Sequence, residues 1–220
     1  MCIRDRSQSQ SYGLELVIHK GIPLQSGMGS SAASAVAGAV VANALLENPL
    51  SKTELLMYAL EGEKFASGGL HADNVAPSLF GGLVFCPKHN LPNTSSIKMP
   101  DTLSSIVLHP ELKVNTAESR LKLKKNYSLD VLLQQQSYLA GFVLGVIQND
   151  ITLIRENLRD ILIEPQRASD VPCFKKIQEI ALNNGALGCS ISGSGPSIFA
   201  ICENNKSSQL EGLMLSLIHI

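Results

Sequence analysis

The chain has 220 residues and carries 18 Lys and Arg against 19 Asp and Glu, which gives a formal net charge of −1. A nearly neutral chain without a basic run lacks the clustered cations that nucleic-acid binding requires. Hydrophobic residues make up 45% of the chain, which excludes a disordered protein, and no apolar run reaches the roughly 18 residues of a membrane-spanning helix. We therefore predict a soluble globular protein without nucleic-acid or membrane partners, long enough for one large or two small domains.

The two ends of the chain are related at the level of DNA. Residues 1–6 can be back-translated as ATG TGT ATA AGA GAC AG, and the reverse complement, read in another frame, encodes the Leu-Ser-Leu-Ile-His-Ile of residues 215–220. Two ends encoded by opposite strands of one short element are typical of sequencing-adapter read-through. We expect both ends to be non-native and residues 7–214 to be an internal piece of a longer protein. The opening also lacks the apolar segment of a signal peptide.

The cysteines within residues 7–214 indicate a reducing compartment. They are Cys86, Cys173, Cys189 and Cys202. They show neither the Cys-x-x-Cys spacing nor the nearby histidines that a zinc site would have. We expect these thiols to be reduced and mostly buried, and the protein to be cytoplasmic.

The first half of this segment is predicted to be mainly helical. In chain order we expect a strand over residues 14–19, a loop over 21–29, a helix from Ser30 to about Leu46, a helix from Ser51 to about Ala66, one or two helical turns over 74–80 and a short strand over 83–86. The first of these helices is apolar nearly all round, which is typical of a buried helix. The second begins with Ser51 followed three residues later by Glu54, the pattern of a capping box.

The second half follows an irregular stretch. Residues 87–103 contain three prolines and several Asn and Ser residues, and we interpret them as a domain boundary. Beyond it we expect a strand over 106–109, helices over 130–147, 151–158 and 171–183, and strands over 188–191 and 197–201 around a glycine turn. Strands and helices mix without strict alternation, so the predicted class is α+β. The predicted domains cover residues 7–95 and 103–214.

The string Pro-Leu-Gln-Ser-Gly-Met-Gly-Ser-Ser-Ala-Ala at residues 23–33 carries the clearest chemical signal. Gly27 and Gly29 let the backbone approach a ligand closely, and they directly precede a helix whose free N–H groups favour an anion. Ser30 and Ser31 add hydroxyls for phosphate oxygens or a metal ion. The glycines alone also fit an ordinary turn before a serine N-cap, or a dinucleotide-binding loop. No lysine follows as in a P-loop, and no strand with an acidic residue at its end follows at the spacing that ribose binding needs.

The whole string resembles the phosphate loop of the GHMP kinases, which wraps the ATP phosphates without a P-loop lysine. The string Ile-Ser-Gly-Ser-Gly-Pro-Ser at residues 191–197 resembles a second glycine-rich turn of that family. The resemblance implies the two-domain GHMP kinase fold, with an N-terminal α/β domain that lacks its first part here and a C-terminal α+β sandwich-like domain. It implies that ATP contacts Pro23, Ser26, Gly27, Met28, Gly29, Ser30, Ser31, Ala32, Gly193 and Gly195.

A third segment, His-Ala-Asp-Asn-Val-Ala-Pro at residues 71–77, resembles the substrate segment of the homoserine kinase branch of this family. Further matches lie at Thr116, at Arg120 and at residues 164–167, whereas residues 121–124 depart from the usual Leu-Pro. The branch implies transfer of phosphate from ATP to L-homoserine, which gives O-phospho-L-homoserine on the route to threonine. It implies substrate contacts from His71, Asp73, Asn74, Thr116, Arg120 and Arg167.

Glu63 is the candidate magnesium ligand. It shares the apolar face of the second predicted helix, where a carboxylate is costly unless it is paired or bound to a metal. Glu61, two positions earlier, points to another side of that helix. The family resemblance also places the magnesium ligand eight residues before His71, which is Glu63. The resemblance therefore implies a Mg2+ site formed by Glu63 with Ser30 or Ser31.

The chemistry of homoserine suggests roles for the remaining residues. Homoserine is a zwitterion whose carboxylate suits planar guanidinium groups, and Arg120 and Arg167 are the candidates. Asn74 is expected to position the attacking hydroxyl. An amide side chain cannot act as a general base, so the expected mechanism is direct in-line transfer, with Asn74 and Glu63 as the catalytic residues.

Other functions stay open at this point. Another GHMP kinase, of the mevalonate type, would share the phosphate loop. A dinucleotide-binding oxidoreductase would need a parallel sheet and an acidic ribose ligand, and a non-catalytic GHMP-like module would lack the magnesium carboxylate. The scattered histidines His19, His89 and His109 are interpreted as structural. We also expect the 220-residue chain to be inactive alone, and a homodimer is one option for the whole protein.

Overall fold

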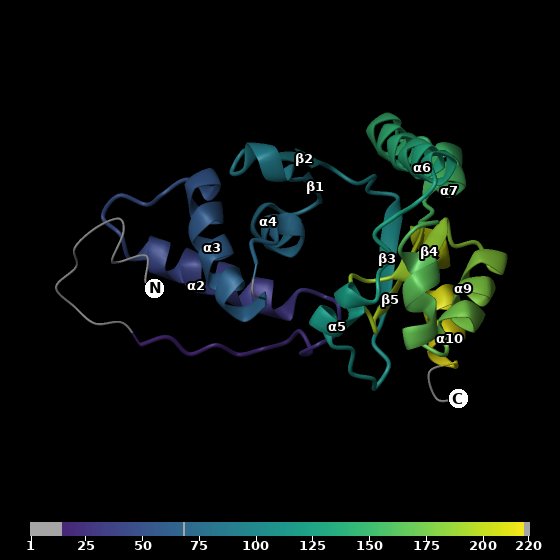
Figure 1. Ribbon diagram of the computed structural model, residues 1–220, viewed down its shortest axis with the longest axis horizontal. Coiled ribbons are helices and arrows are strands. Elements are labelled where there is room, and N and C mark those ends of the chain that lie inside the picture. Colours follow the sequence, from purple (N-terminus) through teal and green to yellow (C-terminus); the bar gives the residue numbers. More distant parts are fainter. Residues whose placement is uncertain (1–14, 68, 218–220) are drawn as a thin grey trace. The chain divides into compact units, whose positions relative to one another are not determined.

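The computed structural model describes residues 15–67 and 69–217, which belong to two compact units (Figure 1). The first unit comprises Met1–Leu24 and Gly29–Ile97, and the second comprises Gln25–Met28 and Lys98–Ile220. The short Gln25–Met28 segment therefore folds with the C-terminal half of the chain, although the residues on both sides of it belong to the N-terminal half.

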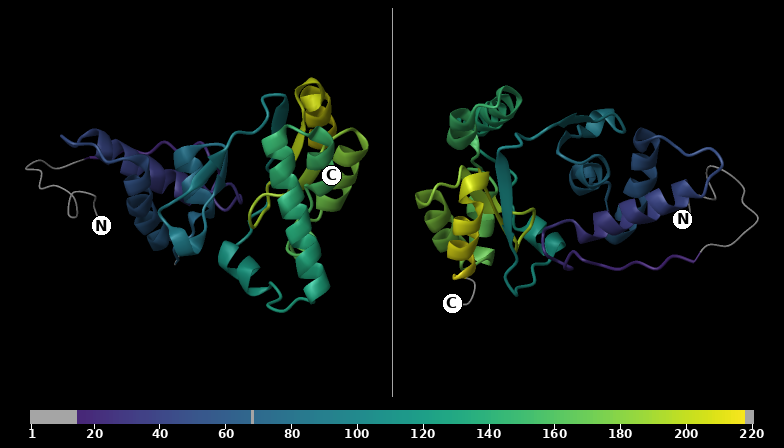
Figure 2. Two further views of the ribbon diagram at one scale, coloured as in Figure 1. Left: turned by 90° about the horizontal axis from the view of Figure 1, so that it is seen from above. Right: turned by 180° about the vertical axis from the view of Figure 1, so that it is seen from behind.

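Three helices pack against one another in the first unit. They are α2 (Ser30–Ala44), α3 (Lys52–Ser67) and α4 (Ala72–Phe80), and Figure 2 shows them from two further sides. A small antiparallel sheet follows, made of β1 (Leu83–Phe85) and β2 (Ser95–Ile97) with the short helix η1 (Lys88–Asn90) between them. The core between the helices contains the fully buried side chains of Ala32, Leu56, Leu60 and Val75, so helix packing rather than the small sheet holds this unit together.

Ser51 and Glu54 form the predicted capping box at the start of α3. The Ser51 backbone N–H donates to Glu54 Oε2 at 2.8 Å, and the Glu54 N–H donates to Ser51 Oγ at 3.3 Å. Hydrogen bonds from the Ser51 hydroxyl and backbone lower the pKa of Glu54 below its ordinary value. Further along α3, Gly62 permits a close approach to α2, since a Cβ there would lie 3.2 Å from the Cβ of Ala35.

The strand predicted over residues 14–19 is wrong for the part that the structure describes. Residues 15–20 are irregular, and the successive side chains of Leu16, Val17 and Ile18 are all exposed. A β-strand needs a neighbouring strand to satisfy its backbone N–H and C=O groups, and no strand in the described part of the chain pairs with this segment. The sequence pattern therefore indicates a strand propensity that has no partner here.

A three-stranded antiparallel sheet forms the centre of the second unit. Its order is β3 (Leu103–Leu108), β5 (Ile198–Glu203), β4 (Gly188–Ile191). The alternate side chains of Ile198, Ala200 and Cys202 on β5 are fully buried, so one face of the sheet carries the core. The helices α9 (Phe174–Asn183) and α10 (Ser207–Leu215) pack with this sheet and contribute Phe174, Ile177, Leu210 and Met214 to the same core.

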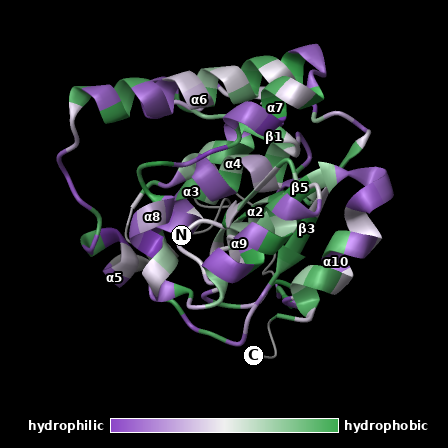
Figure 3. Ribbon diagram, turned by 90° about the vertical axis from the view of Figure 1, so that its right-hand side faces the viewer, coloured by the Kyte–Doolittle hydropathy of each residue, from purple (hydrophilic) through white to green (hydrophobic). Residues whose placement is uncertain are grey.

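The other helices of this unit are α5 (Thr116–Leu121), α6 (Leu129–Gln148), α7 (Ile151–Asn157), α8 (Glu164–Arg167), η2 (Ala168–Asp170) and η3 (Asn204–Lys206). The long helix α6 and α7 form a hairpin, in which Asn149 adopts a left-handed conformation and the Asp150 side chain accepts the N–H of Leu153 at 3.0 Å. Gly145 allows the two helices to touch, because a Cβ there would lie 2.9 Å from the backbone N of Ile154. Figure 3 shows both hydrophilic and hydrophobic residues along α6.

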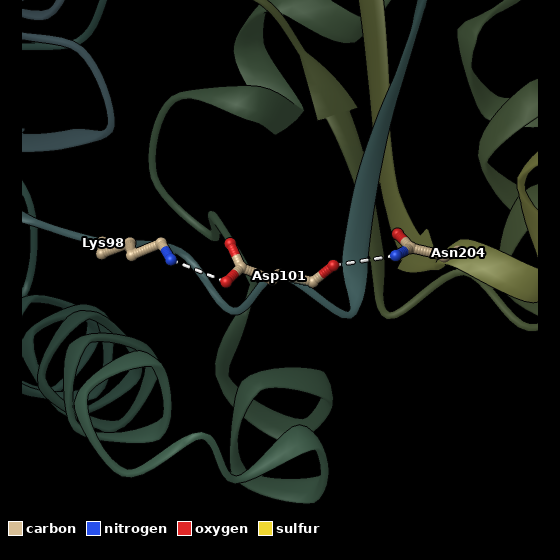
Figure 4. Close-up of polar contacts among 3 residues, drawn as sticks. All are labelled: Lys98, Asp101 and Asn204. Atoms are coloured by element: carbon tan, nitrogen blue, oxygen red, sulfur yellow. Dashed lines mark hydrogen bonds and ion pairs between the residues drawn. The ribbon is translucent and has the colours of Figure 1, made fainter.

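Hydrogen bonds fix the start of β3 against the end of β5. Asn204 Nδ2 donates to the carbonyl of Asp101 at 2.8 Å (Figure 4). The Asn204 N–H donates to the carbonyl of Thr102 at 2.9 Å. Asp101 also forms an exposed ion pair with Lys98 at 2.6 Å. These contacts support the register in which Leu103 pairs with Glu203.

The predicted α+β class is confirmed, and so are the helix expected after the first glycine-rich segment and the two strands expected on either side of the second. The elements β2, α5, α8 and α10 were not predicted, because segments of three to nine residues show too little periodicity. Among the described residues, no helix combines the length and apolarity needed to cross a membrane. The predictions about residues 1–6 and 218–220 lie outside the described range, and the predicted domain bounds stay predictions.

Candidate functional site

The glycine-rich loop ends at the N-terminus of α2. Gly29 is the N-cap residue with φ 70°, and no side chain caps the helix. The first intrahelical bond is donated by Ala33 to the Gly29 carbonyl at 2.9 Å, so the N–H groups of Ser30, Ser31 and Ala32 have no acceptor within the helix. The first turn contains no acidic residue. This helix end therefore has the backbone donors and the dipole of an anion site.

The structure distinguishes the two serines at this helix end. The Ser30 hydroxyl donates to the carbonyl of Ile22 at 2.9 Å. The Ser31 hydroxyl donates to Glu63 Oε1 at 3.1 Å, and the Glu63 side chain is 5% exposed. Glu61 is more exposed than Glu63. Helices α2 and α3 therefore bring together one hydroxyl and one buried carboxylate, and oxygen donors of this kind suit Mg2+.

Asn74 lies directly beside Gly29. A Cβ placed on Gly29 would approach both the Cβ and the Oδ1 of Asn74 to 3.1 Å. Asn74 is half-buried in the first turn of α4, whereas its neighbour Asp73 is exposed. His71 is the N-cap residue of α4, and its Nε2 would lie 2.8 Å from a Cβ on Gly69. The first unit therefore places the amide of Asn74 against the loop residue that begins α2.

The preceding loop residues pack against the second glycine-rich turn, within the second unit. The Ser192 hydroxyl donates to the carbonyl of Gly27 at 2.9 Å, and the Ser197 N–H donates to the carbonyl of Ser26 at 3.1 Å. Gly27 has φ 77°, and a Cβ there would clash with the carbonyl oxygen of Ser192. Backbone thus meets backbone, which explains why glycine is required at this position.

Arg167 contacts the same turn. It ends the short helix α8, and its Nη1 donates to the carbonyl of Gly193. The Asp160 carboxylate accepts the N–H groups of residues 162–164 and so fixes the start of α8. Arg167 is therefore held both by its helix and by the turn.

Arg120 lies in a segment that is bound to the region of Arg167. Lys122 forms an ion pair with Asp170 at 2.9 Å. Gln166 Oε1 accepts the Lys124 N–H at 2.8 Å, and Gln166 Nε2 donates to the Tyr127 hydroxyl at 2.8 Å. Gln166 in α8 and Asp170 in η2 thus connect this region to the residues that follow Arg120. That Arg120 and Arg167 both bind the homoserine carboxylate stays a prediction.

The predicted site residues divide between the two units. The first unit holds Pro23, Gly29, Ser30, Ser31, Ala32, Glu63, His71, Asp73 and Asn74, and the second holds Ser26, Gly27, Met28, Thr116, Arg120, Arg167, Gly193 and Gly195. Pro23 is exposed. Thr116 begins α5, and its side chain lies outside what the structure describes.

The sequence does not single out Ser192 and Ser197 as site residues, and it gives His109 only a structural interpretation. The two serines stand on either side of Gly193 and Gly195 in the string at residues 191–197. This position in the string is the feature from which their role could have been predicted. His109 forms a hydrogen bond with Ser197, and nothing in the sequence reveals that contact because it depends on the pairing of β3 with β5.

The cysteines show no sign of a role in the site. Burial raises the pKa of the Cys189 thiol to about 12 and that of Cys202 above its ordinary value, with nearby carboxylates adding to both shifts. Burial, followed by the charge of Asp73, raises the pKa of Cys86 in the same direction. All three, with Cys173, are free thiols. Within the described residues, no group of three or more His, Cys, Asp and Glu could hold a metal ion.

Comparison with known proteins places these elements in a family. The GHMP kinases N terminal domain matches residues 2–82, and the GHMP kinases C terminal domain matches residues 142–211. The homoserine kinase of Chlorobaculum tepidum is 40% identical over 199 residues, which cover 90% of this chain and 61% of that protein. The homoserine kinase of Xanthomonas campestris pv. campestris is 46% identical over 189 residues, which cover 86% and 58%.

Solved structures of GHMP kinases also resemble this chain. The crystal structure of homoserine kinase from Cytophaga hutchinsonii matches with a TM-score of 0.85 and 41% identity, over 91% of this chain and 64% of that one. The L. major mevalonate kinase, at 20% identity and a TM-score of 0.58 over 91% and 63%, shares the fold. The chain spans about 60% of the length of the curated relatives it matches. With both domains matched in order, the chain belongs to the GHMP kinase family.

Proposed function

We propose that the protein catalyses the phosphorylation of L-homoserine by ATP, giving ADP and O-phospho-L-homoserine for threonine biosynthesis. One observation carries the proposal: the amide of Asn74 lies against Gly29, the residue that begins the anion-binding end of α2. A group that can orient a hydroxyl is thus next to donors that can hold a phosphoryl group. The similarity to homoserine kinases at 40–46% identity supports homoserine as the phosphate acceptor.

The phosphates of ATP are proposed to bind at the loop and the N-terminus of α2. The N–H groups of Ser30, Ser31 and Ala32 supply donors for phosphate oxygens. Gly27 and Gly29, both in left-handed conformations, have no side chain that would obstruct these donors. Pro23, Ser26 and Met28, together with Gly193 and Gly195, are proposed to line the remaining nucleotide site. Charge on the transferred group would be stabilised mainly by these fixed donors.

We propose that Ser31 and Glu63 hold the Mg2+ that accompanies ATP. One hydroxyl and one carboxylate suit a magnesium site that substrate phosphates and water complete. When bound, the ion neutralises charge on the phosphates and on the phosphoryl group in transfer. Ser31 is preferred over Ser30 because it is the serine whose hydroxyl donates to Glu63.

The acceptor is proposed to bind through two chemically distinct ends. Arg120 and Arg167 bind the homoserine carboxylate, and Asn74 orients the hydroxyl, with His71, Asp73 and Thr116 as further contacts. Because an amide cannot remove a proton, Asn74 contributes by alignment. The homoserine oxygen would bond to the γ-phosphorus as the bond to the ADP oxygen breaks, and the hydroxyl proton would pass to an oxygen of the transferred phosphoryl group and then to water.

An Asn74→Ala variant tests this proposal. Since the chain spans only part of its relatives' length, activity is measured in a chimera, in which residues 7–214 are joined to the flanking segments of the Cytophaga hutchinsonii homoserine kinase. We expect homoserine-dependent ADP release from the chimera, and little from the 220-residue chain alone. Asn74→Ala should lower kcat at least about tenfold with a smaller change in KM.

Ser78→Ala is the matched control, because Ser78 is exposed on the same helix. It should leave kcat unchanged. A chimera that folds but shows no homoserine-dependent ADP release would contradict the proposed activity, whereas equal effects of the two variants would contradict the role of Asn74 alone.

The compartment and the oligomeric state remain proposals as well. We propose a cytoplasmic protein, since the free thiols of Cys86, Cys173, Cys189 and Cys202 suit a reducing compartment. A homodimer stays a prediction, which light scattering of the chimera would measure.

A further inference from the structure

We propose that His109 and Ser197 together hold residues 26–28 of the glycine-rich loop in the conformation that accepts ATP, so that His109 is a positioning residue of the nucleotide site. The proposal rests on the proposed function only in that these loop residues are taken to bind ATP. The hydrogen-bond pair itself, and its effect on the loop backbone, can be tested without any activity.

The register of the sheet brings the two residues together. Leu108 at the end of β3 pairs with Ile198 at the start of β5. One step further along an antiparallel pair, His109 faces Ser197. The two side chains meet there, with 3.0 Å between His109 Nδ1 and Ser197 Oγ. A one-residue slip of β3 would turn the histidine to the other face and remove the contact.

Ser197 connects this histidine to both glycine-rich segments. Its side chain is 0% exposed, and His109 is the partner that the structure gives to its hydroxyl. Its backbone N–H donates to the carbonyl of Ser26 at 3.1 Å, and its carbonyl accepts the N–H of Ser192 at 2.8 Å. A buried hydroxyl that loses its partner is destabilising, so the histidine favours the one position of Ser197 in which all three bonds form.

Ser26 transmits this position to the loop. The Ser26 side chain is 1% exposed, and its Oγ accepts the N–H of Met28 at 3.2 Å. Ser192 in turn donates its hydroxyl to the carbonyl of Gly27 at 2.9 Å. The carbonyls of two successive loop residues are therefore fixed by the turn that Ser197 closes. Their fixed orientation determines where the following N–H groups point.

Hydrogen exchange of the backbone amides tests the pair directly in the 220-residue chain. His109→Leu removes the hydrogen bond, whereas His109→Asn keeps a side-chain amide near the position of Nδ1. In the leucine variant we expect exchange at the Ser197 and Met28 amides to accelerate at least about fivefold, and in the asparagine variant to return toward the original rate. Ser197→Ala removes the same bond from the other side and should accelerate Met28 as well.

Ser104→Ala is the control for a general loosening of the sheet. Ser104 also lies on β3, and its hydroxyl donates to Asn204 Oδ1 at 2.7 Å, away from the loop. It should leave the Met28 amide unchanged. Unchanged exchange in both His109→Leu and Ser197→Ala, or the same acceleration in Ser104→Ala, would overturn the proposal whether or not the protein is a kinase.

Kinetics of the chimera separate positioning from mere stability. His109→Leu should raise KM for ATP at least about fivefold and leave KM for homoserine unchanged, and His109→Asn should restore most of the loss. Accelerated exchange with an unaltered KM for ATP would show that the pair only stabilises the fold, and would overturn the positioning role. If the unmodified chimera has no kinase activity, the proposed function fails, and the exchange experiment still decides on the pair.

Discussion

Glu63 and Glu61 lie two residues apart on α3 in different surroundings. Glu63 is 5% exposed and accepts a hydrogen bond from Ser31, whereas Glu61 is more exposed. We expect Glu63→Gln in the chimera to lower magnesium-dependent turnover more than about tenfold, because a correctly held metal ion is worth several kcal/mol in the transition state. Glu61→Gln should have little effect. Small, equal losses in a titration of turnover against Mg2+ would remove Glu63 from the metal site.

Arg120 and Arg167 are expected to recognise the carboxylate of homoserine. Replacing either with Ala should raise KM for homoserine at least about tenfold, because a bound carboxylate would lose a charge-assisted partner. Lys should restore little, since a point charge cannot reproduce the planar fork of a guanidinium group.

The readout for both arginines is the ratio of kcat/KM for homoserine to kcat/KM for an analogue without the carboxylate. An unchanged ratio in both Ala variants would show that neither arginine binds this group. Because Arg167 also donates to the Gly193 carbonyl, KM for ATP is measured alongside, and a change confined to it would assign Arg167 to the turn instead.

At the scale of elements, the capping box of α3 gives a prediction about stability. The pKa of Glu54 is lowered by the Ser51 hydroxyl and backbone. A lowered carboxyl pKa in the folded state means that its stabilisation is present above the unfolded pKa and is lost as pH falls through the folded pKa. Urea unfolding of the 220-residue chain should therefore show a larger difference between Glu54→Gln and the unmodified chain near neutral pH than in acid.

Ser51→Ala removes the other half of the box and should lower the free energy of unfolding by about 0.5–2 kcal/mol. Thr53→Ala, in the exposed first turn of the same helix, is the control. A difference for Glu54→Gln that stays constant across this pH range would contradict the assigned cause of the pKa shift.

The sequence predicted those helices and strands whose determinants lie within a few neighbouring residues. The capping box and the apolar stripe of α3 are local, so the sequence predicts both this helix and the burial of Glu63. The strand predicted over residues 14–19 is wrong because pairing is not a local property. The contact of His109 with Ser197 depends on the register of β3 against β5, which residues about 90 positions apart determine.

The sequence likewise predicted the segments that form the candidate site but not the contacts between them. The two glycine-rich strings identify the loop and the turn, but not the hydrogen bonds from Ser192 and Ser197 that join them. The sequence leaves the choice between Ser30 and Ser31 open, because both hydroxyls precede the same helix. Only the packing of α2 on α3 shows which of them donates to Glu63.

At the scale of the whole molecule, the glycine-rich loop belongs to both units. Gln25–Met28 folds with the second unit, and the chain enters the first unit at Gly29. The half of the loop in the second unit is fixed by the turn at residues 191–197, and the half in the first unit begins α2 beside Asn74.

Transfer of phosphate from ATP to homoserine is the activity that we propose for the whole protein. The most direct measurement incubates the chimera with ATP, Mg2+ and an equimolar mixture of L-homoserine and mevalonate, and identifies the phosphorylated product by ³¹P NMR and mass spectrometry. We predict O-phospho-L-homoserine as the product, formed in step with ADP, and no phosphorylated mevalonate above background. Phosphorylation of mevalonate in preference to homoserine, or ADP release without either product, would contradict the account.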